Sequence, residues 1–256
     1  NPLRSNGDRM RQGWFGCACG PPNIARLLAS LGTYIYSQSN DGLWVHLYIG
    51  GAARATLADG TTVTLTQATR YPWDGEVTLT THLPRPTTFT LSLRIPGWCE
   101  GARVAVNGEE ISDTTQSGRY LQLDRSWTDG DTVHLSLPMP IQRLEAHPCV
   151  TNNLGHVALR RGPVVYCLEE IDHDTNVHAI QLPADAPLTT DFEPGLLHGV
   201  CVIRGEARVQ KASAWDGRLY RPVQLARTRP VALTAVPYYA WNNRGPGTMT
   251  VWIRSH

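Results

Sequence analysis

The sequence lacks a strong charge of either sign and any long hydrophobic run. Its 23 basic and 22 acidic residues give a formal net charge of +1, and no stripe of Lys and Arg offers a field for nucleic acid. No apolar run approaches the ~20 residues that span a bilayer. A glycine-rich phosphate loop, a Ser-His-Asp order and a dinucleotide-binding fingerprint are missing as well. We therefore expect neither nucleic acid nor a membrane as a partner.

The sequence also lacks a starting methionine and the charged-then-apolar pattern of a signal peptide. We therefore expect the native N-terminus to lie upstream of Asn1, and we expect a cytoplasmic protein. Cysteine is too sparse for a disulfide scaffold, with six in 256 residues. Those at 99, 149, 167 and 201 lie in strand-like apolar surroundings and are interpreted as buried, reduced thiols.

One cysteine stands directly before a predicted helix. Pro21 and Pro22 suit a first helical turn, where a missing N–H costs nothing. Cys19 therefore lies beside unpaired N–H groups and the positive end of the helix dipole, which favour a thiolate. This is the environment of a nucleophile or a metal ligand, and equally that of a small cysteine packed at a tight turn. The apolar residues that follow recur as one helical face predicted to be buried, at Ile24, Leu27, Leu28, Leu31 and Ile35.

After Ser37 the hydrophobic periodicity becomes that of strands. Short alternating segments are separated by turn signals such as Asn107-Gly108, a pattern typical of antiparallel β-sandwiches. Pro138-Met139-Pro140 ends the first set of strands, because prolines cannot continue a central strand. A second and looser set follows, in which residues 177–181 and 223–225 are predicted strands.

Two groups of residues invite a catalytic or sugar-binding role, and the sequence favours a simpler one. Glu169 and Glu170 are neighbours on a predicted strand, so their side chains point to opposite faces and cannot flank one bond. We interpret them as solvated or strand-end carboxylates. Tryptophans such as Trp127 could stack on sugars, but core packing is favoured for them.

Several motifs, taken in order along the chain, resemble the C-terminal half of glycoside hydrolase family 127, the β-L-arabinofuranosidase family. The first is the segment from Gly13 to Asn23, which is similar to the last helical segment of that family's catalytic barrel. The others run nearly to the end of the chain: Tyr71-Pro72-Trp73-Asp74-Gly75, Arg94-Ile95-Pro96-Gly97-Trp98-Cys99, Val106-Asn107-Gly108-Glu109, Arg160 to Glu169, and Pro237 to Gly245.

The resemblance implies a fold and a set of domain limits. It implies a mainly β chain with two antiparallel, jelly-roll-like β-sandwich domains, preceded by one α-helix left from a truncated (α/α)6 barrel. Residues 1–36 would be the barrel remnant, residues 37–140 plus 233–256 the first sandwich, and residues 141–232 the second. The terminal strand would thus cross back to the first sandwich.

The resemblance also implies the chemistry. A terminal β-L-arabinofuranosyl residue would be hydrolysed with retention of configuration by a cysteine nucleophile held on zinc, and Cys19 matches that nucleophile. Gly20 stands where the family typically has a second zinc-binding cysteine, which leaves Cys17 as a substitute ligand beside Cys19. The remaining zinc ligands and the acid/base glutamate would lie upstream. We therefore expect zinc in the longer protein, no metal in this chain alone, and no activity of this chain alone.

The expected partners are an arabinofuranosyl-containing oligosaccharide and the upstream barrel, with a second copy of the chain as a further candidate. An alternative from another class is a non-catalytic carbohydrate-binding or assembly module. A structural metal or redox module built on Cys17 and Cys19 is a third, weaker alternative.

Overall fold

The computed structural model describes residues 11, 13, 16, 19–111, 115–210, 217–220, 222 and 228–255. Cys17 and the strand predicted at 223–225 lie outside these residues. The chain divides into two compact units at Met139 and Pro140, one that begins at Trp14 and one that contains everything after Met139. We call them the N-terminal and the C-terminal unit. This division coincides with the predicted boundary at Pro138-Met139-Pro140.

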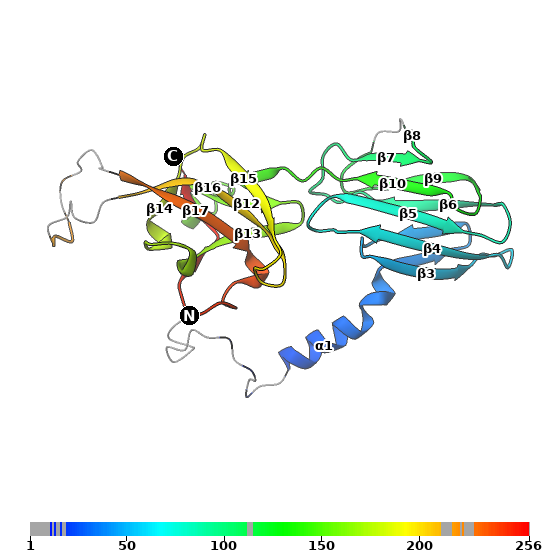
Figure 1. Ribbon diagram of the computed structural model, residues 1–256, viewed down its shortest axis with the longest axis horizontal. Helices are drawn as coiled ribbons and strands as arrows, with labels where there is room; N and C mark the ends of the chain where they lie inside the picture. The colour runs from blue at the N-terminus through cyan, green and yellow to red at the C-terminus, as the bar shows by residue number, and fades with distance from the viewer. Residues whose placement is uncertain are drawn as a thin grey trace. The chain divides into compact units, whose positions relative to one another are not determined.

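The N-terminal unit starts with one helix and continues as two β-sheets (Figure 1). A four-stranded sheet has the order β1-β2-β6-β9, and a six-stranded sheet has the order β3-β4-β5-β10-β7-β8. All pairings are antiparallel except that of β2 with β6. The elements are α1 (Gly20–Ser30), the 3-10 helix η1 (Leu31–Tyr34), β1 (Tyr36–Ser39), β2 (Gly42–Val45), β3 (Gly51–Thr56), β4 (Thr62–Thr69), β5 (Glu76–His82), β6 (Thr87–Arg94), β7 (Arg103–Val106), β8 (Glu109–Glu110), β9 (Tyr120–Trp127) and β10 (Thr132–Ser136).

Alternating side chains explain why these strands form a two-layered unit. Along β4 and β5 every second residue is buried, as expected for strands with one face on a core and the other toward solvent. Trp127 is fully buried and donates its Nε1–H to the Phe89 carbonyl at 2.9 Å, which confirms core packing for this residue. At Asn107 and Gly108 both φ angles are positive, 51° and 84°, so the predicted turn joins β7 to β8.

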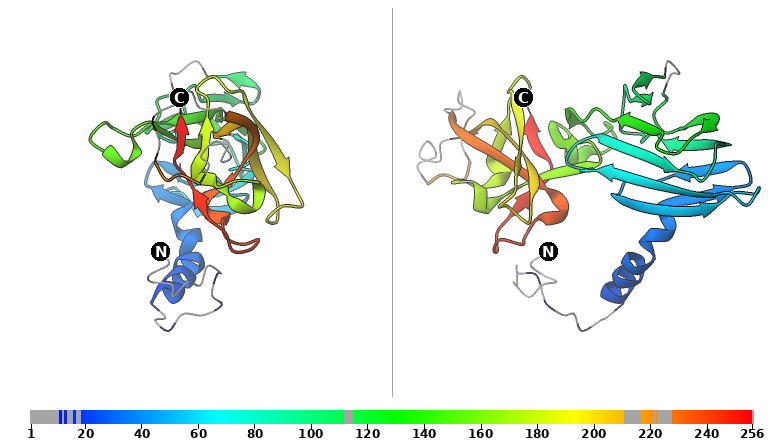
Figure 2. Two further views of the ribbon diagram at one scale, coloured as in Figure 1. Left: turned by 90° about the vertical axis from the view of Figure 1, so that its left-hand side faces the viewer. Right: turned by 45° about the vertical axis from the view of Figure 1, so that its right-hand side comes forward.

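The C-terminal unit is one nine-stranded sheet with the order β11-β12-β19-β14-β16-β17-β13-β18 and β15 paired to β16. A further pairing of β12 with β13 closes six of these strands into a ring, and the views in Figures 1 and 2 show the strands wrapped around a common centre. The elements are β11 (Ile141–Leu144), η2 (Thr151–Asn153), β12 (His156–Arg161), β13 (Val164–Glu169), η3 (Glu170–Asp172), η4 (Val177–Ala179), β14 (Ile180–Leu182), β15 (Leu188–Glu193), β16 (Val200–Gln210), β17 (Thr228–Pro237), η6 (Tyr238–Ala240), β18 (Met249–Thr250) and β19 (Ile253–Ser255).

The predicted return of residues 233–256 to the first sandwich is wrong. β17 pairs with β13 and β16, and β19 pairs with β12 and β14. Ile253 of β19 is 1% exposed and belongs to the core that also holds Leu182 and Leu233. The second β domain therefore continues to the C-terminal strand. Periodicity identifies a strand and its buried face, but it does not identify the neighbouring strand.

Two local strand predictions also differ from the structure. Of residues 177–181, the first three form the 3-10 turn η4 and β14 begins only at Ile180, because Asn176 accepts a hydrogen bond from the His178 amide at 2.9 Å and begins a local turn. β3, which was not predicted, is an edge strand of small residues with mostly exposed side chains. Such a strand carries little hydrophobic signal.

No helix in the described part of the chain is long and apolar enough to cross a membrane.

Candidate functional site

Cys19 lies at the start of α1, as the sequence predicts. The helix begins at Gly20 with both prolines in its first turn, and no acidic residue occupies that turn. The Cys19 side chain is exposed and does not cap the helix. An exposed sulfur at this position is accessible to an electrophile or a metal ion.

A short chain of hydrogen bonds fixes the backbone around Cys19. Asn23 donates from Nδ2 to the Cys19 carbonyl oxygen at 2.8 Å, and Arg26 donates from Nη1 to Asn23 Oδ1 at 2.8 Å. Both side chains come from the first turns of α1, so the helix itself orients the residue before it.

The apolar face of α1 is not buried by the residues that the structure describes. Ile24, Leu27 and Leu28 are 53–65% exposed, and α1 has no buried residue. Tyr34 is exposed too, while Leu31 is half-buried. The burial predicted for this face is therefore not found within the described chain, and apolar side chains are exposed around Leu27 and Tyr34. Both ribbon views show α1 projecting from the sheets of its own unit (Figures 1 and 2).

The described residues do not by themselves fit a zinc ion. Among them, no three His, Cys, Asp or Glu side chains come together as a ligand group, and a catalytic zinc site takes three protein ligands. Cys19 is the one predicted ligand that the structure describes. At Gly20 an added Cβ would meet no atom within 4 Å, so space does not exclude a larger side chain there.

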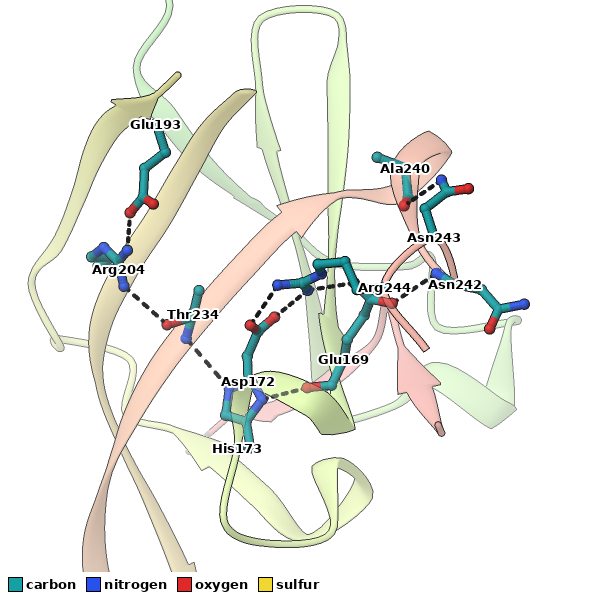
Figure 3. Close-up of polar contacts among 10 residues, drawn as sticks. All are labelled: Glu169, Asp172, His173, Glu193, Arg204, Thr234, Ala240, Asn242, Asn243 and Arg244. Atoms are coloured by element: carbon teal, nitrogen blue, oxygen red, sulfur yellow. Dashed lines mark hydrogen bonds and ion pairs between the residues drawn. The ribbon is translucent and has the colours of Figure 1, made fainter. Parts of the chain in front are cut away.

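A second constellation, which sequence reasoning missed, lies at the end of β13 in the C-terminal unit. Arg244 donates from Nη2 to Glu169 Oε2 at 2.5 Å and to Asp172 Oδ2 at 2.5 Å, and from Nη1 to Asp172 Oδ1 at 2.7 Å. The remaining oxygen of Glu169 accepts the Asn242 amide at 2.7 Å. Figure 3 shows the guanidinium of Arg244 between the two carboxylates.

Glu169 and Glu170 bind different parts of the segment that joins η6 to β18. Glu169 is 5% exposed and holds Asn242 and Arg244, whereas Glu170 accepts the amide and hydroxyl of Thr248 at 2.7 and 3.0 Å. The interpretation as strand-end carboxylates is confirmed, but Glu169 is buried rather than solvated. Together they tie the segment after η6 to β13.

His173 extends this network toward β17. Its Nε2 accepts the Thr234 amide at 3.3 Å, so its Nδ1 must donate to the Glu169 carbonyl oxygen at 2.7 Å. The geometry thus assigns the neutral Nδ1–H tautomer to His173. Thr234 in turn accepts from Arg204, which is paired with Glu193 (Figure 3).

Burial and charge act together on the groups around this cluster. Burial would lower the pKa of Arg244, but hydrogen bonds to Asp172 and Glu169 outweigh that effect and raise the pKa. Burial, followed by the nearby charge of Glu169, raises the pKa of the Cys167 thiol to about 12. Cys167 is therefore an inert, protonated core thiol. Cys99 and Cys201 are buried as predicted, but the prediction of a buried Cys149 is wrong, because this residue is exposed. The cluster has the features of a structural clamp, because its carboxylate oxygens all hold neighbouring groups.

Comparison with known proteins identifies relatives of the whole described chain. Residues 42–139 match the model of the "Beta-L-arabinofuranosidase, GH127 middle domain", and residues 141–254 match the "Glycoside hydrolase family 127 C-terminal domain". The chain is 37% identical over 269 aligned positions to a non-reducing end beta-L-arabinofuranosidase of Bifidobacterium longum subsp. longum, an alignment that covers 99% of the chain and 39% of that protein.

Solved structures agree with these matches. A GH127 beta-L-arabinofuranosidase from Geobacillus stearothermophilus T6 is 50% identical with a TM-score of 0.92, and the alignment covers 97% of the chain and 39% of that structure. A GH127 beta-arabinofuranosidase is 34% identical with a TM-score of 0.86, covering 96% of the chain and 40% of that structure. The chain spans about two fifths of the length of these relatives.

Proposed function

The chain belongs to glycoside hydrolase family 127 and carries the middle and C-terminal domains of that family. On that premise we propose that it is the C-terminal part of a retaining β-L-arabinofuranosidase with Cys19 as nucleophile. The observation that carries this proposal is the exposed sulfur of Cys19 at the start of α1. The substrate class would be an oligosaccharide with a terminal β-L-arabinofuranosyl residue.

The role proposed for Cys19 is covalent catalysis in two displacements. The thiolate attacks the anomeric carbon, a C–S bond forms, and the C–O bond to the leaving group breaks as an acid residue protonates the leaving oxygen. Water then attacks the same carbon, the C–S bond breaks, and the sulfur leaves as thiolate while the water proton passes to the same residue, now a base. Two inversions give net retention. That acid/base residue is proposed to lie upstream, so this chain alone is proposed to be inactive.

Zinc is proposed only for the longer protein. Cys19 would be one ligand and Cys17 a substitute for the cysteine that Gly20 replaces, while the other ligands would come from upstream residues. Because the described residues do not form a zinc site, neither displacement depends on a metal ion held by this chain alone. Gly20→Cys tests this arrangement, since the position has room for a side chain. In a protein that includes the upstream barrel, it should raise the bound zinc measured by atomic absorption.

The test of the nucleophile is hydrolysis of an aryl β-L-arabinofuranoside. The chain alone should stay at background, and fusion to the helical barrel of a family member should give turnover. Cys19→Ala in the fusion should abolish turnover, while Cys149→Ala, which removes another exposed cysteine, should leave it unchanged. Turnover that survives Cys19→Ala would overturn the proposed nucleophile.

A further inference from the structure

A pocket in the C-terminal unit is not accounted for by the proposed chemistry. It has a volume of about 660 Å³ and lies between the loop that joins β15 to β16 and the segment from η6 to Arg244. A volume in this range suits a small ligand. All its lining residues belong to the C-terminal unit.

The pocket has an aromatic wall that the core does not use. Tyr239 lines the pocket and is 60% exposed, so much of its ring is available to a ligand. An aromatic face combines an apolar surface with a polar edge. The Tyr239 hydroxyl is a donor at neutral pH, since its ordinary pKa of 10.0 already lies well above 7 and partial burial raises it further.

Two polar side chains of the pocket, Asn243 and Arg244, are held in place before any ligand arrives. Asn243 donates from Nδ2 to the Ala240 carbonyl oxygen at 2.8 Å, which fixes its amide and leaves its Oδ1 as an acceptor. Arg244 is fixed by Glu169 and Asp172, as Figure 3 shows. A preformed site loses less entropy when it binds.

The opposite wall is a loop in an uncommon backbone conformation. Leu197 and His198 both have positive φ angles, 50° and 66°, and Gly199 follows at 97°. The Gly199 amide donates to the Leu196 carbonyl at 2.8 Å and closes this turn. Left-handed residues other than glycine are disfavoured and cluster at ligand-binding segments. Here they place His198, an exposed donor and acceptor, on the pocket wall.

The charges at this wall argue against an anionic ligand. Among the described residues that line the pocket, Arg244 is the one side chain with a permanent positive charge, and it is already bonded to two carboxylates, Glu169 and Asp172. This cluster has a net negative charge and its carboxylate oxygens are all engaged. A neutral ligand that offers hydroxyl groups and one apolar face fits these groups best.

We propose that this pocket is a second, non-catalytic binding site for a neutral oligosaccharide, in which Tyr239 stacks on a sugar ring while Asn243 and His198 bond its hydroxyls. The choice of an arabinofuranosyl probe below rests on the proposed function, but the site itself needs no catalytic residue. The ligand of this pocket belongs to the same class as the proposed substrate. The pocket would therefore hold the longer protein near the polysaccharide that carries its substrate.

The experiment is a titration of the 256-residue chain carrying Cys19→Ala with an arabinofuranosyl trisaccharide, followed by amide NMR shifts. Shifts should concentrate in residues 194–199 and 238–245. Tyr239→Ala should weaken binding at least tenfold and Asn243→Ala severalfold. Tyr220→Ala removes a tyrosine that is 90% exposed and does not line the pocket, and it should bind as tightly as the unchanged chain.

A galacturonate trisaccharide tests the charge argument in the same assay, and it should bind more weakly than the neutral probe. Absence of shifts with the neutral probe, shifts that map elsewhere, or equal binding by Tyr239→Ala would each overturn the site. Tighter binding of the galacturonate would overturn the assignment to neutral sugars. Because Cys19 is absent from the tested chain, none of these outcomes depends on the proposed nucleophile.

Discussion

Glu169 and Arg244 lie 75 residues apart in the sequence and form a buried ion pair, with Glu169 Oε2 2.5 Å from Arg244 Nη2. Their side chains are 7% and 17% exposed, so water screens the pair poorly. The pair joins the end of β13 to the segment after η6. That segment carries Tyr239 and Asn243, so the ion pair supports the wall of the proposed sugar site.

We expect Arg244→Met to destabilise the C-terminal unit by about 3–5 kcal/mol, because it leaves the buried carboxylate of Glu169 and the largely buried one of Asp172 without their cation. The control is Asp174→Asn, which removes an exposed partner of Arg229 and should cost about 1 kcal/mol or less. Urea unfolding monitored by circular dichroism gives both values. Equal costs for the two variants would contradict the structural role of the buried pair.

Gly42→Ala should disrupt the contact between β2 and β6. An added Cβ at Gly42 would lie 1.9 Å from the Thr90 carbonyl oxygen, a backbone atom that cannot rotate away. Overpacking of this kind costs about 1–3 kcal/mol and sometimes more. Gly51→Ala is the matched control, since its Cβ would meet nothing within 4 Å. A thermal melt should therefore shift downward for Gly42→Ala only.

Iodoacetamide should label Cys19 faster than Cys99 or Cys167 at neutral pH. Cys19 is exposed, whereas the other two are buried with raised thiol pKa values, and labelling needs an accessible thiolate. Cys149, which is also exposed, separates exposure from the effect of the helix. Peptide mass spectrometry gives the four rates. Faster labelling of Cys149 than of Cys19 would count against activation by the helix N-terminus.

The stability of the C-terminal unit should fall with rising pH above about 9. The pKa of Cys167 rises from its ordinary 9.0 to about 12 on folding, and that of Tyr166 from 10.0 to about 12, in both cases mainly through burial. Above pH 9 the folded state keeps these protons while the unfolded state releases them. The contribution of the two groups to the free energy of unfolding is therefore fully present below pH 9 and is lost between pH 9 and 12. Each group contributes a slope of about 1.4 kcal/mol per pH unit.

Urea unfolding between pH 8 and pH 11 measures this slope. Cys167→Ala should be less stable at every pH because it leaves a small cavity. Its pH dependence should nevertheless be shallower than that of the unchanged chain. An identical slope for the two proteins would show that Cys167 does not titrate on unfolding.

Local sequence signals determined much of the secondary structure of this protein. The prolines at positions 21 and 22 set the start of α1 beside Cys19, alternating apolar residues set the strands, and Asn107-Gly108 set a hairpin turn. Each of these features depends on φ preferences or on side-chain periodicity within a few residues. These features can therefore be predicted from the sequence without knowledge of the partner strands.

Only the tertiary structure decided which strands and side chains meet. Residues 233–256 show a strand period, yet that period fits either sheet, and only the pairing of β19 with β12 and β14 placed them. From the sequence, Glu169 is predicted to be an ordinary strand-end carboxylate, because no residue near it indicates that Arg244 is its partner. The pocket beside Tyr239 likewise combines two loops about forty residues apart. Contacts of this kind arise when hydrophobic burial closes the chain on itself, and they leave no local pattern to predict them.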